Sequence, residues 1–190
     1  MLNGSPVEEA DIATEAGGRP FLPGRKVDFG ITHSGCLTAV SFAGGVNLRT
    51  SCDVEHIRPR TGAAEIAENF FSPNETKYLF DAGKFNETKF YEIWTLKECF
   101  IKLMGLSVFD MAGVPSFISQ SLEFEFTAAA PLPLSFRLYE LSGKVGLTDN
   151  KEHYMLATVI EDSCKQCLRQ SPEIVWFSKP SFVCKLIACL

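Results

Sequence analysis

The chain has 190 residues, a formal net charge of -5, 46% apolar residues and 16 phenylalanines. It is long enough for one domain with a sizeable core, or for two half-domains that share one, and its apolar content excludes a disordered protein. The negative charge, without clustered Lys and Arg, argues against a nucleic-acid binder, because such proteins hold the phosphate backbone with basic clusters.

No run of about twenty apolar residues occurs, so we expect no membrane span. Residues 1–15 are acidic and small, unlike the basic and then apolar plan of a secretion signal, which predicts a cytoplasmic protein.

The seven cysteines are predicted to be reduced, because their number is odd and no secretion signal precedes them. Cys36, Cys52 and Cys99 lie within apolar patterns that predict buried thiols. Cys164 and Cys167 form a C-x-x-C sequence, but a zinc site needs further ligands at matching spacing. We therefore favour ordinary thiols there over a metal or redox site.

The first predicted elements surround a glycine- and proline-rich loop. Residues 1–18 show no sustained periodicity and predict a leader that is loosely packed or disordered. Arg19 lies in the loop that follows, either as a solvated surface charge or as a phosphate contact. A strand is predicted over 27–35, with His33 and Ser34 where it gives way to a turn. Such positions suit binding residues, although a lone histidine is more often structural.

After a strand over 36–42, residues 46–55 predict a further strand that carries Asp53 and Glu55 near its end. Residues two apart in a strand point to the same side, so the two carboxylates should lie together. Like charges side by side repel unless a positive group lies between them. The alternatives are a strand end that faces water, or pairing with Arg58 or Arg60.

Three helices are predicted next. The first covers residues 63–70. The second begins at the Ser-Pro-Asn-Glu sequence 72–75, which combines a capping serine, a proline at the first helical position and a glutamate that can reach back. It is expected to run to about Ala82. The third begins after Asn86, a capping residue, and ends at Gly105, which favours the left-handed conformation that closes helices.

The third helix combines an apolar face with an ordered pair of charges. Apolar residues recur at spacings of three and four, as in a helix that packs on a core. Glu98 and Lys102 stand four residues apart and therefore share a face. They are either an ordinary solvated pair or, together with Asp53 and Glu55, part of one site.

Later strands are predicted over 122–126, 134–139 and 153–160, as an antiparallel sheet under the central helix. The overall class is therefore α+β, with antiparallel sheets packed against a long helix. Residues 162–190 change in character and predict a docked extension or a poorly ordered end.

Four motifs then occur in a fixed order and spacing: Gly18-Arg19-Pro20, Ile31-Thr32-His33-Ser34, Asp53-Val54-Glu55, and Trp94-Thr95-Leu96-Lys97-Glu98 with Lys102 and Gly105. Over residues 17–160 they resemble the 4′-phosphopantetheinyl transferases of the surfactin-synthetase-activating type. The resemblance implies that family's pseudo-twofold fold, here with residues 19–56 as an incomplete N-terminal half, 57–161 as the C-terminal half with the central helix, and 162–190 as an extension.

The resemblance also implies an activity, the Mg²⁺-dependent transfer of the phosphopantetheine arm of coenzyme A to a serine of an apo acyl or peptidyl carrier protein. Adenosine 3′,5′-bisphosphate would be released, and fatty-acid, polyketide or peptide synthesis would be served. The implied roles are Mg²⁺ binding by Asp53, Glu55 and Glu98, coenzyme A binding by Arg19, His33, Ser34, Lys97 and Lys102, and catalysis by Glu98 and Lys102. Converging carboxylates independently require a dication before an anionic diphosphate can bind beside them.

The chain departs from the family pattern in its short N-terminal half, in Ser51-Cys52 before the first acid, and in Gly30 where an asparagine is common. Two alternatives therefore stay open. One is a non-catalytic or weakly active homologue that binds a carrier protein or a nucleotide, and the other is an unrelated Mg²⁺-dependent phosphohydrolase. We expect a monomer or a homodimer, with neither nucleic acid nor a membrane as partner.

Overall fold

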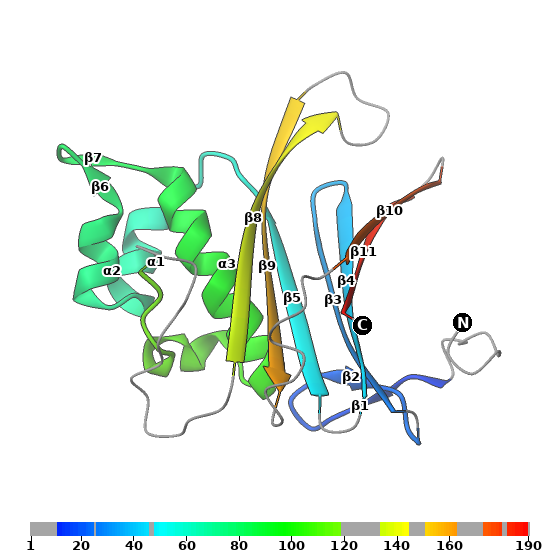
Figure 1. Ribbon diagram of the computed structural model, residues 1–190. Helices are drawn as coiled ribbons and strands as arrows, with labels where there is room; N and C mark the ends of the chain where they lie inside the picture. Colours follow the sequence, from blue (N-terminus) through cyan, green and yellow to red (C-terminus); the bar gives the residue numbers. More distant parts are fainter. Residues whose placement is uncertain are drawn as a thin grey trace.

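A computed structural model describes residues 11–24, 26–45, 48–118, 134–144, 151–162, 173–179 and 182–189. These residues form an α+β structure in three layers, with the helices on one side, a sheet of order β5-β9-β8 in the middle and a sheet of order β10-β11-β4-β3 on the other side (Figure 1). The strands of these sheets are β3 (Val27–Ser34), β4 (Leu37–Gly44), β5 (Leu48–His56), β8 (Leu134–Lys144), β9 (Lys151–Asp162), β10 (Glu173–Lys179) and β11 (Phe182–Cys189).

Five predicted strands are confirmed, and most of their ends agree with the structure to within a few residues. These strands are the ones predicted over 27–35, 36–42, 46–55, 134–139 and 153–160. The one predicted over 122–126 lies outside the described residues. The predicted antiparallel sheets are confirmed by the pairs β3–β4, β5–β9, β8–β9 and β10–β11, while β11 runs parallel to β4, with Val183 opposite Leu37. Parallel neighbours need a long connection, and most of the chain separates these two strands.

The three predicted helices are confirmed as α1 (Ala63–Phe70), α2 (Pro73–Tyr78) and α3 (Glu87–Met104). At the start of α2, the Ser72 N–H donates to the Glu75 carboxylate at 2.7 Å, and the Glu75 N–H donates to the Ser72 hydroxyl at 3.3 Å. The expected continuation to Ala82 is wrong. A hairpin of β6 (Phe80–Asp81) and β7 (Lys84–Phe85) replaces it, because the chain turns at Ala82 and Gly83, both with positive φ.

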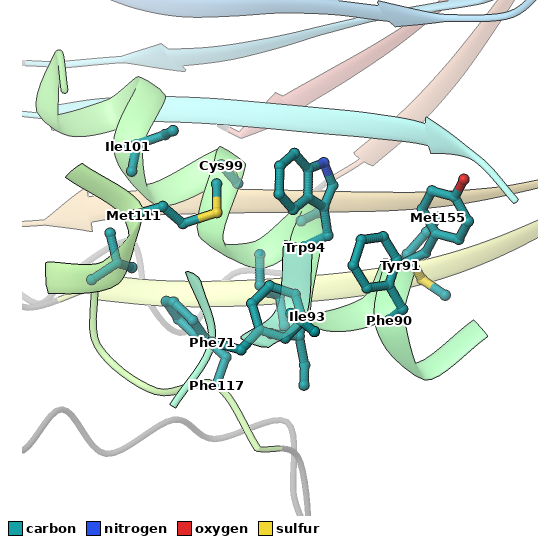
Figure 2. Close-up of a cluster of buried hydrophobic side chains, with 14 of the residues drawn as sticks. Phe71, Phe90, Tyr91, Ile93, Trp94, Cys99, Ile101, Met111, Phe117 and Met155 are labelled. Carbon is teal, nitrogen blue, oxygen red and sulfur yellow. The ribbon is translucent and has the colours of Figure 1, made fainter. Parts of the chain in front are cut away.

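The core of the molecule lies between α3 and the sheet β5-β9-β8. Figure 2 shows part of this cluster, in which Phe90 stacks against Phe71 at 5.5 Å and Trp94 at 5.8 Å between ring centroids. Aromatic pairs at these separations add to the stabilisation from burial. The end of the helix is closed as predicted by Gly105, whose φ is 66°. Helix α3 is therefore packed against the sheet β5-β9-β8.

A second, smaller core joins the two sheets. It contains Leu37, Ala39, Cys52, Val54, Tyr154 and Leu156. Alternate residues of β5 point into it, so the residues between them face α3. This arrangement directs Asp53 and Glu55 toward the helix.

Part of the predicted leader is structured. Strand β1 (Ala13–Thr14) lies within the leader and pairs with β2 (Pro20–Phe21), which follows it, while residues 1–10 lie outside the described part. Cys52 and Cys99 are buried free thiols as predicted, but Cys36 is exposed, because it lies in the turn that joins β3 to β4. The pair Cys164 and Cys167 lies outside the described residues.

Of the helices described, none has the length and apolar character needed to cross a bilayer.

Candidate active site

Strands β3 and β5 meet through side chains of β3 that accept hydrogen bonds from backbone N–H groups of β5. We call these three side chains the β3 ladder, and its contacts are Asp28 with Thr50 (2.7 Å), Thr32 with Val54 (3.3 Å) and Ser34 with His56 (3.0 Å). The ladder residues lie on one face of β3 because they are separated by even numbers of positions. The remaining even position is Gly30, where an added Cβ would lie 2.9 Å from the Ser51 Cα, so glycine allows the strands to approach.

Asp53 lies between the ladder and α3. Its Oδ1 accepts hydrogen bonds from Lys102 Nζ at 2.5 Å and from the Thr32 hydroxyl at 3.1 Å. Its other oxygen, Oδ2, is buried and has no hydrogen-bond partner among the described residues. Burial raises the pKa of Asp53 to about 7, although the nearby Lys102 charge acts to lower it. One oxygen of this carboxylate is therefore free to accept a further positive group.

Glu55 is oriented from both sides. The indole nitrogen of Trp94, which points toward β5 in Figure 2, donates to Oε1 at 3.1 Å, and the Ser34 hydroxyl donates to Oε2 at 3.1 Å. The guanidinium of Arg60 lies 5.1 Å from the centre of the Trp94 ring, within cation–π range. Trp94 thus belongs both to the core and to the candidate site.

Glu98 is half-buried on α3, one turn before Lys102. Burial raises its pKa, the Lys102 charge lowers it and the Glu55 charge raises it. The charges of Glu55 and Glu98 also act to raise the pKa of Asp53. The three predicted carboxylates therefore act on one another electrostatically, although within the described ranges no three Asp, Glu, His or Cys side chains form a metal-binding group.

Arg19 and Lys102 line one cavity of about 330 Å³, together with Ser51, Gly30 and Gly105. Arg19 is buried and makes an ion pair with Asp28. The cavity brings two cations and backbone of the Gly17–Pro20 loop to one end of the row of carboxylates.

Two of the predicted residues lie away from this cluster. His33 is exposed, and strand alternation turns it to the opposite face of β3 from Thr32 and Ser34. Lys97 is 1% exposed and lies on another side of α3, where its ammonium is 3.2 Å from the carboxylate of Glu75.

Asp28, Thr32 and Arg60 have no predicted site role, and Trp94 was predicted only as part of a motif. A signal for Thr32 was present, because Thr32 and Ser34 have the same two-residue spacing as Asp53 and Glu55. No comparable pattern distinguishes Asp28.

Residues 51–158 match the sequence model of the 4′-phosphopantetheinyl transferase superfamily, and the chain belongs to this superfamily. This confirms the resemblance that the four motifs indicate. Among similar curated proteins, the 4′-phosphopantetheinyl transferase psf-1 of Bacillus pumilus is 33% identical over 124 residues, 62% of this chain and 48% of the relative. The 4′-phosphopantetheinyl transferase Sfp of Bacillus subtilis is 33% identical over 103 residues, 52% of this chain and 44% of the relative.

The 4′-phosphopantetheinyl transferase AcpT of Escherichia coli K12 is 31% identical over 119 residues, 62% of this chain and 60% of the relative. The chain thus spans about half the length of the curated relatives it matches.

Proposed function

We propose that this protein transfers the 4′-phosphopantetheine group of coenzyme A to a serine of an apo acyl or peptidyl carrier protein. Membership of the superfamily supports the reaction class. The observation that carries the proposal is the ion pair between the buried Asp53 and the partly exposed Lys102, beside Glu55 and Glu98 and next to the cavity that Arg19 lines. Such a row of acids with two cationic groups at one end suits a diphosphate substrate with a bound dication.

In this proposal Mg²⁺ is held by Asp53, Glu55 and Glu98. The chemistry of the residues fits, because carboxylate oxygens are preferred Mg²⁺ ligands and the buried Asp53 Oδ2 has no partner among the described residues. When bound, Mg²⁺ would neutralise charge on the diphosphate and on the leaving group.

Other side chains of the site would bind coenzyme A, stabilise the leaving oxygen and accept the proton. Arg19 would contact the coenzyme A phosphates in the first cavity, while Ser34 and the exposed His33 of β3 would contact coenzyme A outside that cavity. Lys102 would stabilise the negative charge that develops on the leaving oxygen. Glu98 would accept the proton of the carrier serine as the serine oxygen bonds to the β-phosphorus and the bond to adenosine 3′,5′-bisphosphate breaks. For Lys97 we propose a supporting role through Glu75 in place of contact with coenzyme A.

A second polar cavity of about 440 Å³ lies at the Glu55 end of the site, and its lining includes Ser34, His56, Arg58 and Arg60. We propose that the carrier serine approaches from this side. Arg58 and Arg60 would supply local positive charge for an acidic carrier surface, despite the net negative charge of the chain.

We also propose that residues 19–56 and 57–161 are an incomplete and a complete half of a pseudo-twofold fold. The two separate sheets support a fold in two parts, with β5 of the first part joined to the sheet of the second part by its pairing with β9.

The test mixes the purified protein with coenzyme A, Mg²⁺ and an apo carrier protein, and follows the carrier by mass spectrometry. A phosphopantetheine mass gain with release of adenosine 3′,5′-bisphosphate is expected. Glu98→Gln keeps the shape of the side chain but removes its charge, so labelling should fall by about 100-fold or more while the circular dichroism stays unchanged. The exposed acid Glu68 on α1 provides the matched control, Glu68→Gln.

Near-normal labelling by the Glu98→Gln variant would reject the role of Glu98. Binding of coenzyme A without any mass gain would favour a non-catalytic homologue, and hydrolysed nucleotide would favour a phosphohydrolase.

A further inference from the structure

One oxygen of Asp28 holds two groups from different parts of the chain. Its Oδ2 accepts a hydrogen bond from Arg19 Nη2 and another from the Thr50 N–H at 2.7 Å. Arg19 Nη2 also donates to the Thr50 carbonyl at 3.2 Å. The three residues thus form a closed network that ties the loop before β3 to the strand that carries the site carboxylates.

Asp28 is the carboxylate that orients Arg19, even though Glu15 is also near. The side chains of Arg19 and Asp28 are 6% and 13% exposed, whereas the Glu15 side chain is 44% exposed and lies 3.7 Å from Arg19 Nη1. A shielded charge pair restricts its partners more strongly than an exposed pair, which solvent and salt screen.

The orientation of the Arg19 side chain matters for ligand binding, because Arg19 lines the 330 Å³ cavity with Lys102. Asp28 is not among the described residues that line this cavity. A guanidinium is planar and carries its N–H donors in a fixed fork, so contacts made by one part set the direction of the others. Asp28 can therefore act on a ligand in the cavity through Arg19.

We propose that Asp28 is a positioning residue for the binding of coenzyme A, which presets the Arg19 guanidinium toward a phosphate group. This inference rests on the proposed function. It assigns a role to a residue outside the four motifs, and it predicts that Asp28 has no effect on affinity once Arg19 is removed.

The test is a double-mutant cycle of Arg19→Ala and Asp28→Ala, with the dissociation constant of coenzyme A measured by calorimetry. Asp28→Ala should weaken binding by about tenfold, the ratio expected for one charge-assisted contact. The KM for coenzyme A should rise similarly, with kcat and the KM for the carrier nearly unchanged. The double variant should bind no more weakly than Arg19→Ala alone. Glu15→Gln is the control and should stay within about twofold of the wild type.

Asp28→Asn guards against loss of folding, because its amide oxygen can still accept the Thr50 N–H while the charge that holds Arg19 is removed. It should weaken binding as Asp28→Ala does, with a normal thermal unfolding transition. Additive losses in the cycle, or wild-type affinity in folded Asp28→Asn, would overturn this inference alone. A wild-type protein that binds no coenzyme A would overturn the proposed function as well.

Discussion

The ammonium group of Lys97 lies 3.2 Å from the carboxylate of Glu75, and the two side chains are 1% and 0% exposed. The same carboxylate accepts hydrogen bonds from the Ser72 N–H at 2.7 Å and the Phe117 N–H at 2.6 Å. Burial lowers the pKa of Lys97, and the charge of Glu75 opposes that change. One buried acid therefore joins α2, α3 and the segment that follows the 3₁₀ helix Val108–Gly113.

Glu75→Gln is expected to reduce the free energy of unfolding by about 3–5 kcal/mol, because Lys97 would keep a buried charge without its partner. Urea denaturation measures the change. The control is Asp81→Asn, which removes the more exposed pair that Asp81 forms with Lys89 at 2.5 Å and should have a far smaller effect. Equal losses in the two variants would contradict the importance of the buried pair.

Mg²⁺ is expected to raise the thermal unfolding temperature of the wild-type protein, because an ion that binds only the folded state stabilises it by mass action. Asp53→Asn should abolish this rise, since it removes charge from the carboxylate whose Oδ2 is buried without a described partner. Glu68→Gln, at an exposed position, should retain it. An equal Mg²⁺ effect in Asp53→Asn would count against this carboxylate as a ligand.

Gly30→Ala is expected to destabilise the protein by about 1–3 kcal/mol, as overpacking does in a tight interior. The added methyl group would lie 2.9 Å from the Ser51 Cα and 3.1 Å from the Cys52 nitrogen. Gly113→Ala is the matched control, because no atom lies within 4 Å of its added Cβ. Denaturation of both variants tests the close approach of β3 and β5, which a harmless Gly30→Ala would disprove.

Tyr154 should make stability depend on alkaline pH. Its hydroxyl donates to Glu152 at 2.5 Å, and burial raises the pKa of Tyr154 to about 12. In the unfolded chain a tyrosine loses its proton near pH 10, so between about pH 10 and 12 the unfolded state binds fewer protons and stability falls as pH rises. Tyr154→Phe should make this fall shallower, as measured by urea unfolding at about pH 9 and pH 11. An unchanged pH dependence would refute the prediction.

Local signals explain why the helices could be predicted. The capping box at Ser72 and the glycine at position 105 act on their own turns of helix, so their effects do not depend on tertiary packing. The end of α2 was less accessible to prediction, because Ser72 specifies only where that helix begins. The turn at Ala82 and Gly83 then decides where it must stop.

The candidate site was predictable as far as spacing within one element determines it. Asp53 and Glu55 share a face of β5 because they are two residues apart, and Glu98 and Lys102 share a face of α3 because they are four apart. Contacts between elements depend on packing, which spacing does not contain. The partner of Lys97 could therefore be found only from the structure.

The parallel pairing of β4 with β11 has a consequence for how the molecule reaches its native state. Residue 37 must find residue 183, whereas α1, α2 and α3 contact one another over short sequence separations (Figure 1). Closing such a large loop slows folding, because its entropic cost precedes the contacts that offset it. During synthesis, one edge of β4 must therefore wait for its partner until residues 182–189 have left the ribosome, and chaperones would have most to shield during that interval.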